Sequence, residues 1–464
     1  MLGDTSIDTL EKDSHKFLGS TITFSGKTNE TFELIRDYLS TRLSRIDNML
    51  IRNEYKLKIY TKYLLPSSRF LLTVHDLCKS HLDKLDELCH RYLKKWAGLS
   101  RSATPHILHL EEFTAIKSIR ELYYESHCSA YISTRTKGDI IVNHALDTRL
   151  EREQKWKNKS SSISYADSIY QKTISTDPET EKPKSAKQMI HTEFQNYHSD
   201  HIHSLMIQGD YIRIVKAMET DLDWKSSIYN LPKGLLKFIL NAVLNTLPTN
   251  HNLSLWGKRQ SSKCKHCNST EYLSHVLSGC KVMLDQGRYT WRHDSVLTYI
   301  KQFLTSIVPQ NSEITSDLNG THHTIPADIL PSSDRPDLTI VNRVKKTIHI
   351  FELTVPFEHN IDRQHSYKTN KYASLITDLN SIGYTPIFCA FEVGCRGKIS
   401  KENSKRLFEF TKGINPKETR KVKQICKDLT TIASLCSFYI FKVKDNPSWE
   451  NLSPLSWRPL QNGK

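Results

Sequence analysis

The sequence predicts a multidomain α+β protein, and three observations support this fold class. Apolar residues recur at helical spacing over much of residues 30–152. The stretch "CKHCNSTEYLSHVLSGC", at 264–280, places cysteine and histidine at the spacing of metal ligands. The stretch "RPDLTIVNRVKKTIHIFELTVPFEHN", at 335–360, contains two apolar segments joined by a short basic turn, which predicts paired strands. Helices therefore dominate the N-terminal half, and a sheet belongs to the C-terminal part.

The composition narrows the class of protein. The chain has 464 residues, a net charge of +15 and ten cysteines. Its length allows two to four domains, and its basic excess suits a polyanionic partner such as nucleic acid, although charge alone does not exclude an ordinary soluble protein. Dispersed cysteines are typical of a reducing compartment rather than a disulfide scaffold. We find no apolar signal core and no segment long enough to span a membrane, so we expect an intracellular, nuclear protein.

In chain order, the first half reads as a short strand followed by helices. Residues 17–24 resemble a strand, and helical patterns cover about 30–95, with an expected break near Pro66, and about 110–152. The following stretch, "KNKSSSISYADSIYQKTISTDPETEKPKSAKQ", is rich in polar residues and short of large apolar ones. We therefore expect residues 151–193 to form a flexible linker.

The second half alternates helices with strands. We expect helices at about 194–216, in "KGLLKFILNAVLNTL", at 285–303, at 362–380, at 401–412 and at 417–435. Residues 305–334 look like a loop. Strands are expected at 338–342, at 347–355, in "TPIFCAFEV" and in "SFYIFKV".

The cysteine-rich stretch predicts a structural zinc site. Cys264 and Cys267 are separated by two residues, and His275 and Cys280 follow at distances that can complete a tetrahedron. Four protein ligands leave no open coordination position, so this Zn²⁺ would be structural. His266 is a competing ligand. The alternative is a chance pair of buried cysteines beside an unrelated histidine and cysteine.

The paired strands carry two carboxylates. In the second strand, Ile348, Ile350, Glu352 and Thr354 share one face, and both faces are largely apolar, as in a central strand. A buried carboxylate needs a partner. Asp337 lies at the start of the neighbouring strand, so the two carboxylates together can chelate Mg²⁺. The alternative is a polar contact that only stabilises the strand pair.

Basic residues near these strands are candidates for catalysis and nucleic-acid binding. A lysine two residues after Glu352 would complete a common nuclease pattern, but Thr354 stands there. Lys368 and Lys371, on the following helix, are equal candidates to replace it. Phosphate contacts are expected from five further residues, although solvated surfaces are the alternative: Arg288, Arg292, His293, Lys258 and Arg259.

Several segments together resemble the C-terminal half of the open reading frame of early-branching non-LTR retrotransposons, which carry a restriction-enzyme-like endonuclease after the reverse transcriptase. "HKFLGSTIT" resembles the last palm strand of the polymerase. "LKIYTKYLLPSSRFLLTVH" and "LDKLDELCHRYLKKWAGLSRSATPHILHL" resemble its thumb. "LPKGLLKFILNAVLNTLPTNHNLSLWGK" and the cysteine cluster resemble the linker and zinc knuckle. "RHD", "RPDL", "FELTVPFE", "YKTNKY" and "FEVGCRG" resemble successive nuclease motifs.

The resemblance implies a domain order. It places the end of the palm and a helical thumb-like region at 1–150, the flexible linker at 151–193 and a helical linker region at 194–262. A Cys-Cys-His-Cys zinc knuckle follows at 263–283, then the endonuclease domain at 284–446 and a tail at 447–464. The implied endonuclease fold is the PD-(D/E)xK nuclease core, a mixed sheet flanked by helices.

The resemblance also implies an activity. Asp337 and Glu352 would bind Mg²⁺, a lysine from the next helix (Lys368 or Lys371) would assist, and Glu392 lies in the next strand. The enzyme would nick one strand of a DNA target, and the freed 3′-hydroxyl would prime reverse transcription of element RNA. The polymerase aspartates should precede "FLGSTIT", so we expect a truncated product without reverse transcriptase activity. The alternative is a catalytically inactive nucleic-acid-binding remnant.

Overall fold

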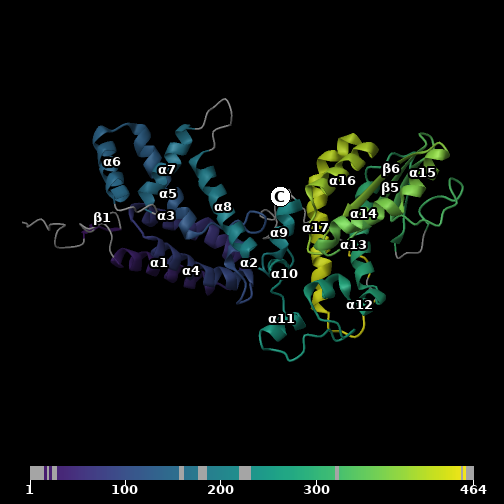
Figure 1. Ribbon diagram of the computed structural model, residues 1–464, viewed down its shortest axis with the longest axis horizontal. Helices are drawn as coiled ribbons and strands as arrows, with labels where there is room; N and C mark the ends of the chain where they lie inside the picture. The colour runs from purple at the N-terminus through teal and green to yellow at the C-terminus, as the bar shows by residue number, and fades with distance from the viewer. Residues whose placement is uncertain are drawn as a thin grey trace, which may run out of the picture. The chain divides into compact units, whose positions relative to one another are not determined.

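The computed structural model describes residues 15–17, 20–22, 29–155, 161–175, 185–218, 231–318, 323–450 and 453–455 (Figure 1). These residues belong to two compact units, one reaching Ile202 and the other beginning at His203. The protein is α+β and mostly helical, with a four-stranded mixed sheet in the second unit. The predicted fold class is therefore confirmed at this level.

The first unit begins with a short antiparallel pair, β1 (His15–Phe17) and β2 (Ser20–Ile22), where one strand was expected. Residues 18–19 and 23–24 of that expected strand lie outside the described residues. The helices that follow are α1 (Asn29–Asp47), α2 (Asn53–Ile59), η1 (Tyr60–Leu64), α3 (Leu65–Val74), α4 (Lys79–Ala97), η2 (Pro105–Leu108), α5 (Ile119–Lys137), α6 (Ile140–Lys155), α7 (Ser162–Ser175) and α8 (Ala186–Ser204).

Local sequence explains the boundaries of these helices. The buried residues of α4 recur every three or four positions and form one apolar face: Leu82, Leu85, Cys89, Leu93 and Trp96. α4 ends where Gly98 adopts a φ of 67°, a left-handed conformation that glycine accepts readily. The break expected at Pro66 is wrong. The proline lies in the first turn of α3, and the wider π-helical turn before it makes room for its ring.

The flexible linker expected at residues 151–193 is also wrong where the structure describes it. Helix α7 buries Ile163, Ala166 and Ile169 in a core shared with α5, and α8 adds Ile190 and Phe194. A few apolar residues at helical spacing were thus sufficient for α7 and α8 to pack against α5, despite the polar composition of the segment. Residues 156–160 and 176–184 of the expected linker lie outside the described part of the chain.

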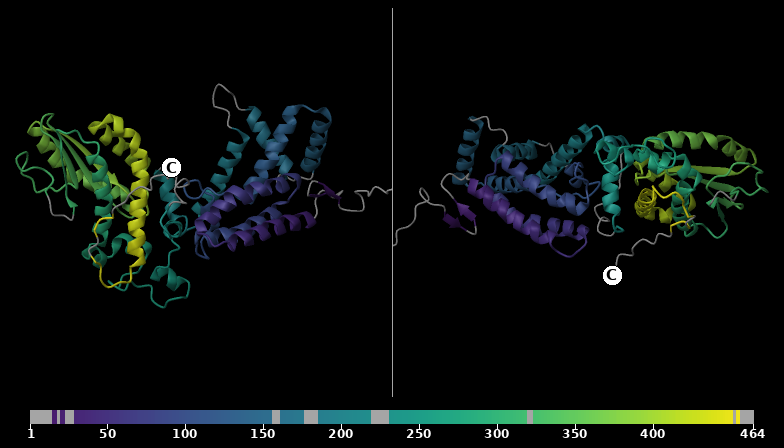
Figure 2. Two further views of the ribbon diagram at one scale, coloured as in Figure 1. Left: turned by 180° about the vertical axis from the view of Figure 1, so that it is seen from behind. Right: turned by 90° about the horizontal axis from the view of Figure 1, so that it is seen from below.

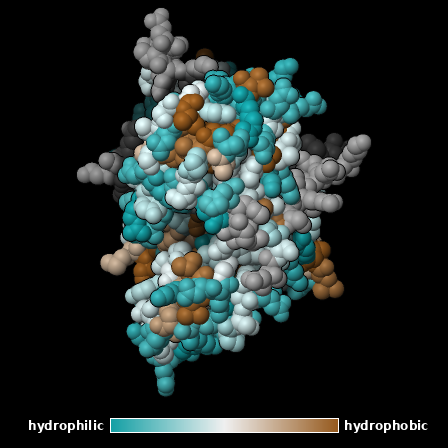
Figure 3. All heavy atoms as spheres, turned by 90° about the vertical axis from the view of Figure 1, so that its right-hand side faces the viewer, coloured by the Kyte–Doolittle hydropathy of each residue, from teal (hydrophilic) through white to brown (hydrophobic). Residues whose placement is uncertain are grey.

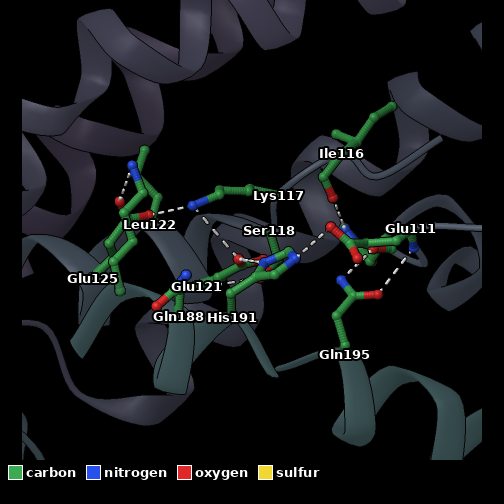
Figure 4. A network of polar contacts seen from close by, with 12 residues as sticks. Glu111, Ile116, Lys117, Ser118, Glu121, Leu122, Glu125, Gln188, His191 and Gln195 are labelled. Carbon is green, nitrogen blue, oxygen red and sulfur yellow. Dashed lines mark hydrogen bonds and ion pairs between the residues drawn. The ribbon is translucent and has the colours of Figure 1, made fainter. Parts of the chain in front are cut away.

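A polar network that includes the buried carboxylates Glu121 and Glu125 joins α5 to α8 (Figure 4). His191 places Nδ1 2.9 Å from Glu121 Oε1 and Nε2 2.9 Å from Glu111 Oε1. The hydrogen bond to Glu121, with further help from Glu111, raises the pKa of His191. Lys117 pairs with the buried Glu125. Charged partners thus satisfy the carboxylates that α5 buries.

The second unit combines the sheet with helices from before and after it. Its elements are α9 (Asp210–Met218), α10 (Leu235–Val243), α11 (Asn250–Leu255), η4 (His275–Gly279), α12 (Lys281–Asp285), α13 (Arg288–Thr305), β3 (Glu313–Ser316), β4 (Leu338–Asn342), β5 (Thr347–Thr354), η6 (Glu358–Asn360), α14 (Ile361–Lys371), α15 (Ala373–Ser381), β6 (Thr385–Glu392), α16 (Lys401–Ile414), η7 (Pro416–Lys421) and α17 (Val422–Lys442).

The sheet has the order β3-β4-β5-β6, with antiparallel pairing up to β5 and parallel pairing between β5 and β6. β5 is an interior strand with both faces buried, as its sequence predicted. Phe351 and Leu353 face a core that includes α13, α16 and α17, and α13 lies beside α17 (Figures 1 and 2). Ile348 and Ile350 pack on the other face, against α15.

Two expectations for the second unit are wrong. β3 lies within residues 305–334, which were expected to be a loop. "SFYIFKV" is not a strand but belongs to the last turns of α17 and the residue after it. Its aromatic and β-branched composition favours a strand locally, yet Ile432, Cys436 and Ile440 are buried along one continuous helical face.

The cysteine-rich segment shares the core of the sheet domain. Cys264 and Cys280 belong to the same buried cluster as Phe351 and Leu353. Phe238 of α10 also packs against α17, with its ring centroid 5.5 Å from that of Phe438. The segment from α10 to the cysteines is therefore part of one compact unit with the sheet.

The face drawn in Figure 3 is mainly hydrophilic, and its apolar side chains form small separate groups. Groups of that size are ordinary on a protein surface. Among the helices in the described ranges, none combines the length and the apolar character that crossing a membrane requires.

Candidate metal centre and carboxylate cluster

The predicted zinc ligands come together. One ligand atom from each of Cys264, Cys267, His275 and Cys280 lies within 4.8 Å of the others. Cys267 Sγ is 3.2 Å from His275 Nε2 and 3.8 Å from Cys280 Sγ. Three thiols and one imidazole at these separations form a group that can bind a metal such as zinc.

Local backbone structure brings the four side chains together. Cys264 and Cys267 flank a tight turn, in which the Cys264 N–H donates to the Ser269 carbonyl at 2.7 Å. His275 begins η4 and Cys280 follows its end. The Tyr289 hydroxyl accepts from the Cys280 N–H at 3.2 Å and anchors the end of that turn. His266 Nε2 lies 2.7 Å from the Lys444 carbonyl, so this ring makes a structural contact and does not compete for the metal.

The two carboxylates of the strand pair lie at one end of β4 and β5. Leu338 pairs with Phe351, so Asp337, one residue before β4, is next to Glu352. The Asp337 N–H donates to Glu352 Oε2 at 3.1 Å. In turn, the Leu353 N–H donates to Asp337 Oδ2 at 2.7 Å. The antiparallel register therefore fixes both carboxylates at the same end of the sheet.

The structure distinguishes the two candidate lysines. The Lys368 ammonium forms an ion pair with Glu352 Oε1. The Lys371 ammonium instead donates to the Tyr372 hydroxyl at 3.0 Å, and that hydroxyl donates to the Arg335 carbonyl at 3.0 Å. Lys368 therefore belongs to the carboxylate cluster, whereas Lys371 borders it.

Burial and charge control the ionisation of this cluster. Burial raises the pKa of Glu352, the neighbouring Asp337 raises it further, and Lys368 opposes both effects. Burial also acts to raise the pKa of Asp337, but the charge of His293 and its hydrogen bond leave that pKa below its usual value. Two carboxylates in such a place need positive partners, which Lys368 and His293 provide.

His293 lies in this cluster, although the sequence suggested a phosphate contact for it. Its Nε2 is 3.2 Å from Asp337 Oδ2, and its Nδ1 is 3.0 Å from Asp294 Oδ1. Burial lowers the pKa of His293, but Asp337 and Asp294 outweigh burial and raise it to about 10. His293 is therefore an imidazolium at neutral pH, and its charge is directed to protein carboxylates.

Arg288 and Arg292 were expected to contact phosphate, and this is wrong. Both are buried, with exposures of 0% and 2%. Arg288 donates to the Val443 carbonyl at 2.9 Å, and Arg292 donates to the Leu277 carbonyl at 2.8 Å. The expectation failed because α17 and the segments around it cover α13 on a side that looked like a polar surface.

The other two basic candidates lie closer to solvent. Lys258 is exposed, and its ammonium lies 6.0 Å from the centre of the Trp256 ring. Arg259 is half-buried and contacts the Asn250 side chain. Their contacts with nucleic acid stay a prediction.

A second buried carboxylate, that of Glu392, contacts His365 and Arg406, which the sequence had not indicated as site residues. Glu392, at the end of β6, has Oε1 3.0 Å from His365 Nδ1 and accepts from Arg406 at 3.3 Å. His365 and Lys368 are three residues apart on α14, so they share one helical face. That spacing was the only sequence signal for His365. Helix α14 thus contacts the carboxylates of both β5 and β6.

No protein-family model and no curated protein sequence matches this chain.

Proposed function

We propose that this chain is a Mg²⁺-dependent DNA endonuclease that nicks one strand and that it derives from a retrotransposon polyprotein. The observation that carries the proposal is the convergence of Asp337, Glu352 and Lys368 at one end of a mixed sheet. Two carboxylates and a lysine beside a sheet end are the groups needed for metal-assisted hydrolysis of a phosphodiester.

The donor set fits a hard divalent cation. Asp337 and Glu352 offer carboxylate oxygens, which Mg²⁺ prefers. The raised pKa of Glu352 and the ion pair with Lys368 indicate that the two carboxylates need positive charge close by. When bound, Mg²⁺ would polarise the scissile phosphate and lower the pKa of a bound water.

The protein residues have separate roles in this proposal. The charges of Glu352 and Asp337 outweigh the effect of burial and raise the pKa of Lys368, so its ammonium stays protonated, opposes the rise in the Glu352 pKa and offsets phosphate charge. The His293 imidazolium and the Leu353 N–H orient Asp337. The cysteine cluster holds structural Zn²⁺ and stabilises the chain leading into α13. We also propose the DNA target and element RNA as partners and the nucleus as the location, supported by the charge of +15.

A second candidate function is an inactive nucleic-acid-binding remnant. The observation that favours it is that Lys368 pairs with Glu352, and His293 with Asp337, so the cluster already satisfies its own charges. Such a remnant would bind DNA without cutting it.

A plasmid-nicking assay with Mg²⁺ separates the two candidates. We expect the parent to nick, and Asp337→Ala and Glu352→Ala to bind DNA without nicking. Asp378→Ala removes an exposed carboxylate from the same unit and should nick like the parent. A parent protein that binds DNA but does not nick it, with Mg²⁺ or Mn²⁺ and with varied target DNA, would favour the remnant.

A further inference from the structure

A cavity of about 260 Å³ lies in the first unit, among four helices. Its walls include Lys79 of α4, Arg120 and Tyr124 of α5, Tyr165 of α7, and Glu193 and Tyr197 of α8. All of these residues belong to the unit that ends at Ile202, so the cavity is separate from the carboxylate cluster. None of the activities proposed above uses it.

Aromatic rings form much of the wall. The ring centroids of Tyr124 and Tyr165 are 4.6 Å apart, and Phe194 lies 6.2 Å from Tyr124. Tyr197 is 47% exposed, so its ring is accessible at the mouth. Rings arranged in this way offer π-faces on which a planar ligand can stack.

Two basic side chains, Lys79 and Arg120, lie beside these rings. Lys79 is exposed, and its side chain has no partner among the described residues. The Arg120 guanidinium lies 5.8 Å from the centre of the Tyr197 ring. One nitrogen of Arg120 pairs with Asp83, but its Nε is buried and has no hydrogen-bond acceptor among the described residues. The wall therefore presents the free ammonium of Lys79, whereas the unpaired Nε of Arg120 is itself buried.

The single carboxylate of the wall is already engaged. Glu193 accepts a hydrogen bond from the Tyr165 hydroxyl at 3.0 Å. An aromatic cage with a carboxylate can bind a methylated ammonium group. Here, however, Lys79 and Arg120 would repel a cation, so an aromatic ligand with negative charge is the better match.

We propose that this cavity binds one nucleotide, with its base stacked on the tyrosine rings and its phosphate beside Lys79. The volume, just below the usual range for small-molecule sites, suits one base rather than a larger ligand. The nucleotide is either free or an unpaired position of a single strand, and the chemistry is the same. The net charge of +15 favours the strand. This site does not depend on the proposed nuclease activity.

The test measures binding of short, fluorescently labelled oligonucleotides to the full chain by anisotropy. Single-stranded DNA, single-stranded RNA, duplex DNA and a free mononucleotide as competitor form the four arms. We compare the parent with Tyr197→Ala, Tyr197→Phe and Lys79→Ala. Tyr63→Ala is the matched control, because Tyr63 is 71% exposed in the same unit and does not line this cavity. Thermal unfolding confirms that each variant folds.

We expect Tyr197→Ala to weaken single-strand binding on the order of tenfold, because stacking of one base is lost. Tyr197→Phe keeps the ring and should bind like the parent, as should Tyr63→Ala. Lys79→Ala should weaken binding and reduce the salt dependence by about one phosphate contact. Competition by the mononucleotide would identify a free nucleotide as ligand. If Tyr197→Ala lowers the affinity for only one of the two single strands, DNA or RNA, that strand is the ligand.

Two results would overturn the proposal. One is a folded Tyr197→Ala protein that binds every single strand and the mononucleotide like the parent. The other is binding of a trimethyllysine peptide that depends on Tyr197, with no nucleotide binding that depends on Tyr197. A nicking assay in parallel keeps the two proposals apart, because nicking depends on Asp337 and not on Tyr197.

Discussion

Lys368 and Lys371 differ in what they contact, and this gives a prediction at the scale of single residues. Lys368→Ala should lower the nicking rate by about a hundredfold or more, because the group beside Glu352 is lost. Lys371→Ala should change the rate by a few fold at most, because its ammonium contacts the Tyr372 hydroxyl. Single-turnover nicking measures both. Equal losses from the two variants would contradict the assignment.

The burial of Arg292 gives a second prediction. Arg292→Ala should lower the free energy of unfolding by roughly 2–4 kcal/mol, because it removes the Arg292 donor from the buried Leu277 carbonyl and from the carbonyl of the partly buried Val355. Urea unfolding measures this loss. Lys258→Ala, at an exposed lysine, should stay within about 0.5 kcal/mol of the parent. If the Arg292→Ala protein is as stable as the parent but binds DNA more weakly, the contact between Arg292 and phosphate that the sequence suggested would be correct after all.

At the scale of elements, α14 connects two strands through charged side chains. Its His365 contacts Glu392 of β6, and its Lys368 pairs with Glu352 of β5. Because β5 and β6 are parallel and in register, Glu392 is paired with Thr354, two residues beyond Glu352. One face of α14 therefore contacts the ends of both β5 and β6.

The turn that contains Cys264 and Cys267, together with η4, gives a prediction about metal content. The purified protein should contain a single zinc ion, which Cys267→Ser and Cys280→Ser should lose. His266→Ala should keep it, because His266 contacts the Lys444 carbonyl. Mass spectrometry of the metal content tests this. Loss of zinc in His266→Ala, with retention in Cys280→Ser, would contradict the ligand set.

Removal of that metal should also destabilise the second unit, because Cys264 and Cys280 are part of the core of the sheet. Thermal unfolding with and without a zinc chelator should therefore show a lower midpoint in the chelated sample. An unchanged midpoint in protein shown to have lost its zinc would mean that the cysteines fold without it.

At the scale of the whole molecule, we expect a cluster of buried and half-buried histidines to make the first unit sensitive to acid. His90 Nε2 lies 2.8 Å from His109 Nε2, and His106 Nδ1 lies 2.9 Å from His198 Nδ1. Burial, with a smaller contribution from the neighbouring histidines, lowers the pKa of His90 to about 2 and that of His106 to about 3. Burial likewise lowers the pKa of His109 and His198.

The sign of the pH effect follows from these directions. The unfolded chain has histidine pKa values of about 6.5, so below that pH it binds more protons than the folded unit. The free energy of unfolding should fall there by about 1.4 kcal/mol per pH unit for each such histidine. His191 acts in the opposite sense, because its pKa is raised: its contribution is present at low pH and is lost as pH rises through the folded pKa.

Urea unfolding between about pH 7 and about pH 5.5 tests this prediction. His106→Gln should flatten the pH dependence, because it removes one of the groups that take up a proton on unfolding. A parent protein with equal stability across this range would contradict the neutral state of the cluster.

The sequence by itself determined the local features of this protein. Two continuous apolar segments joined by a basic turn predicted β4 and β5 nearly residue for residue, and ligand spacing identified the cysteine cluster. Asp337 and Glu352 were placed together because antiparallel neighbours must meet at one sheet end. These features depend on residues close together in the chain or on the pairing of two adjacent strands.

Only the tertiary structure decided the features that depend on distant segments. It selected Lys368 over Lys371, and it directed His293 to Asp337 across 44 positions of the chain. It also buried Arg292, and it kept the end of α17 helical although the aromatic and β-branched composition of "SFYIFKV" favours a strand. Local periodicity shows which face of a helix is apolar, but the segments that cover its other faces come from elsewhere in the chain. Burial and charge partners therefore follow from packing and cannot be read from spacing.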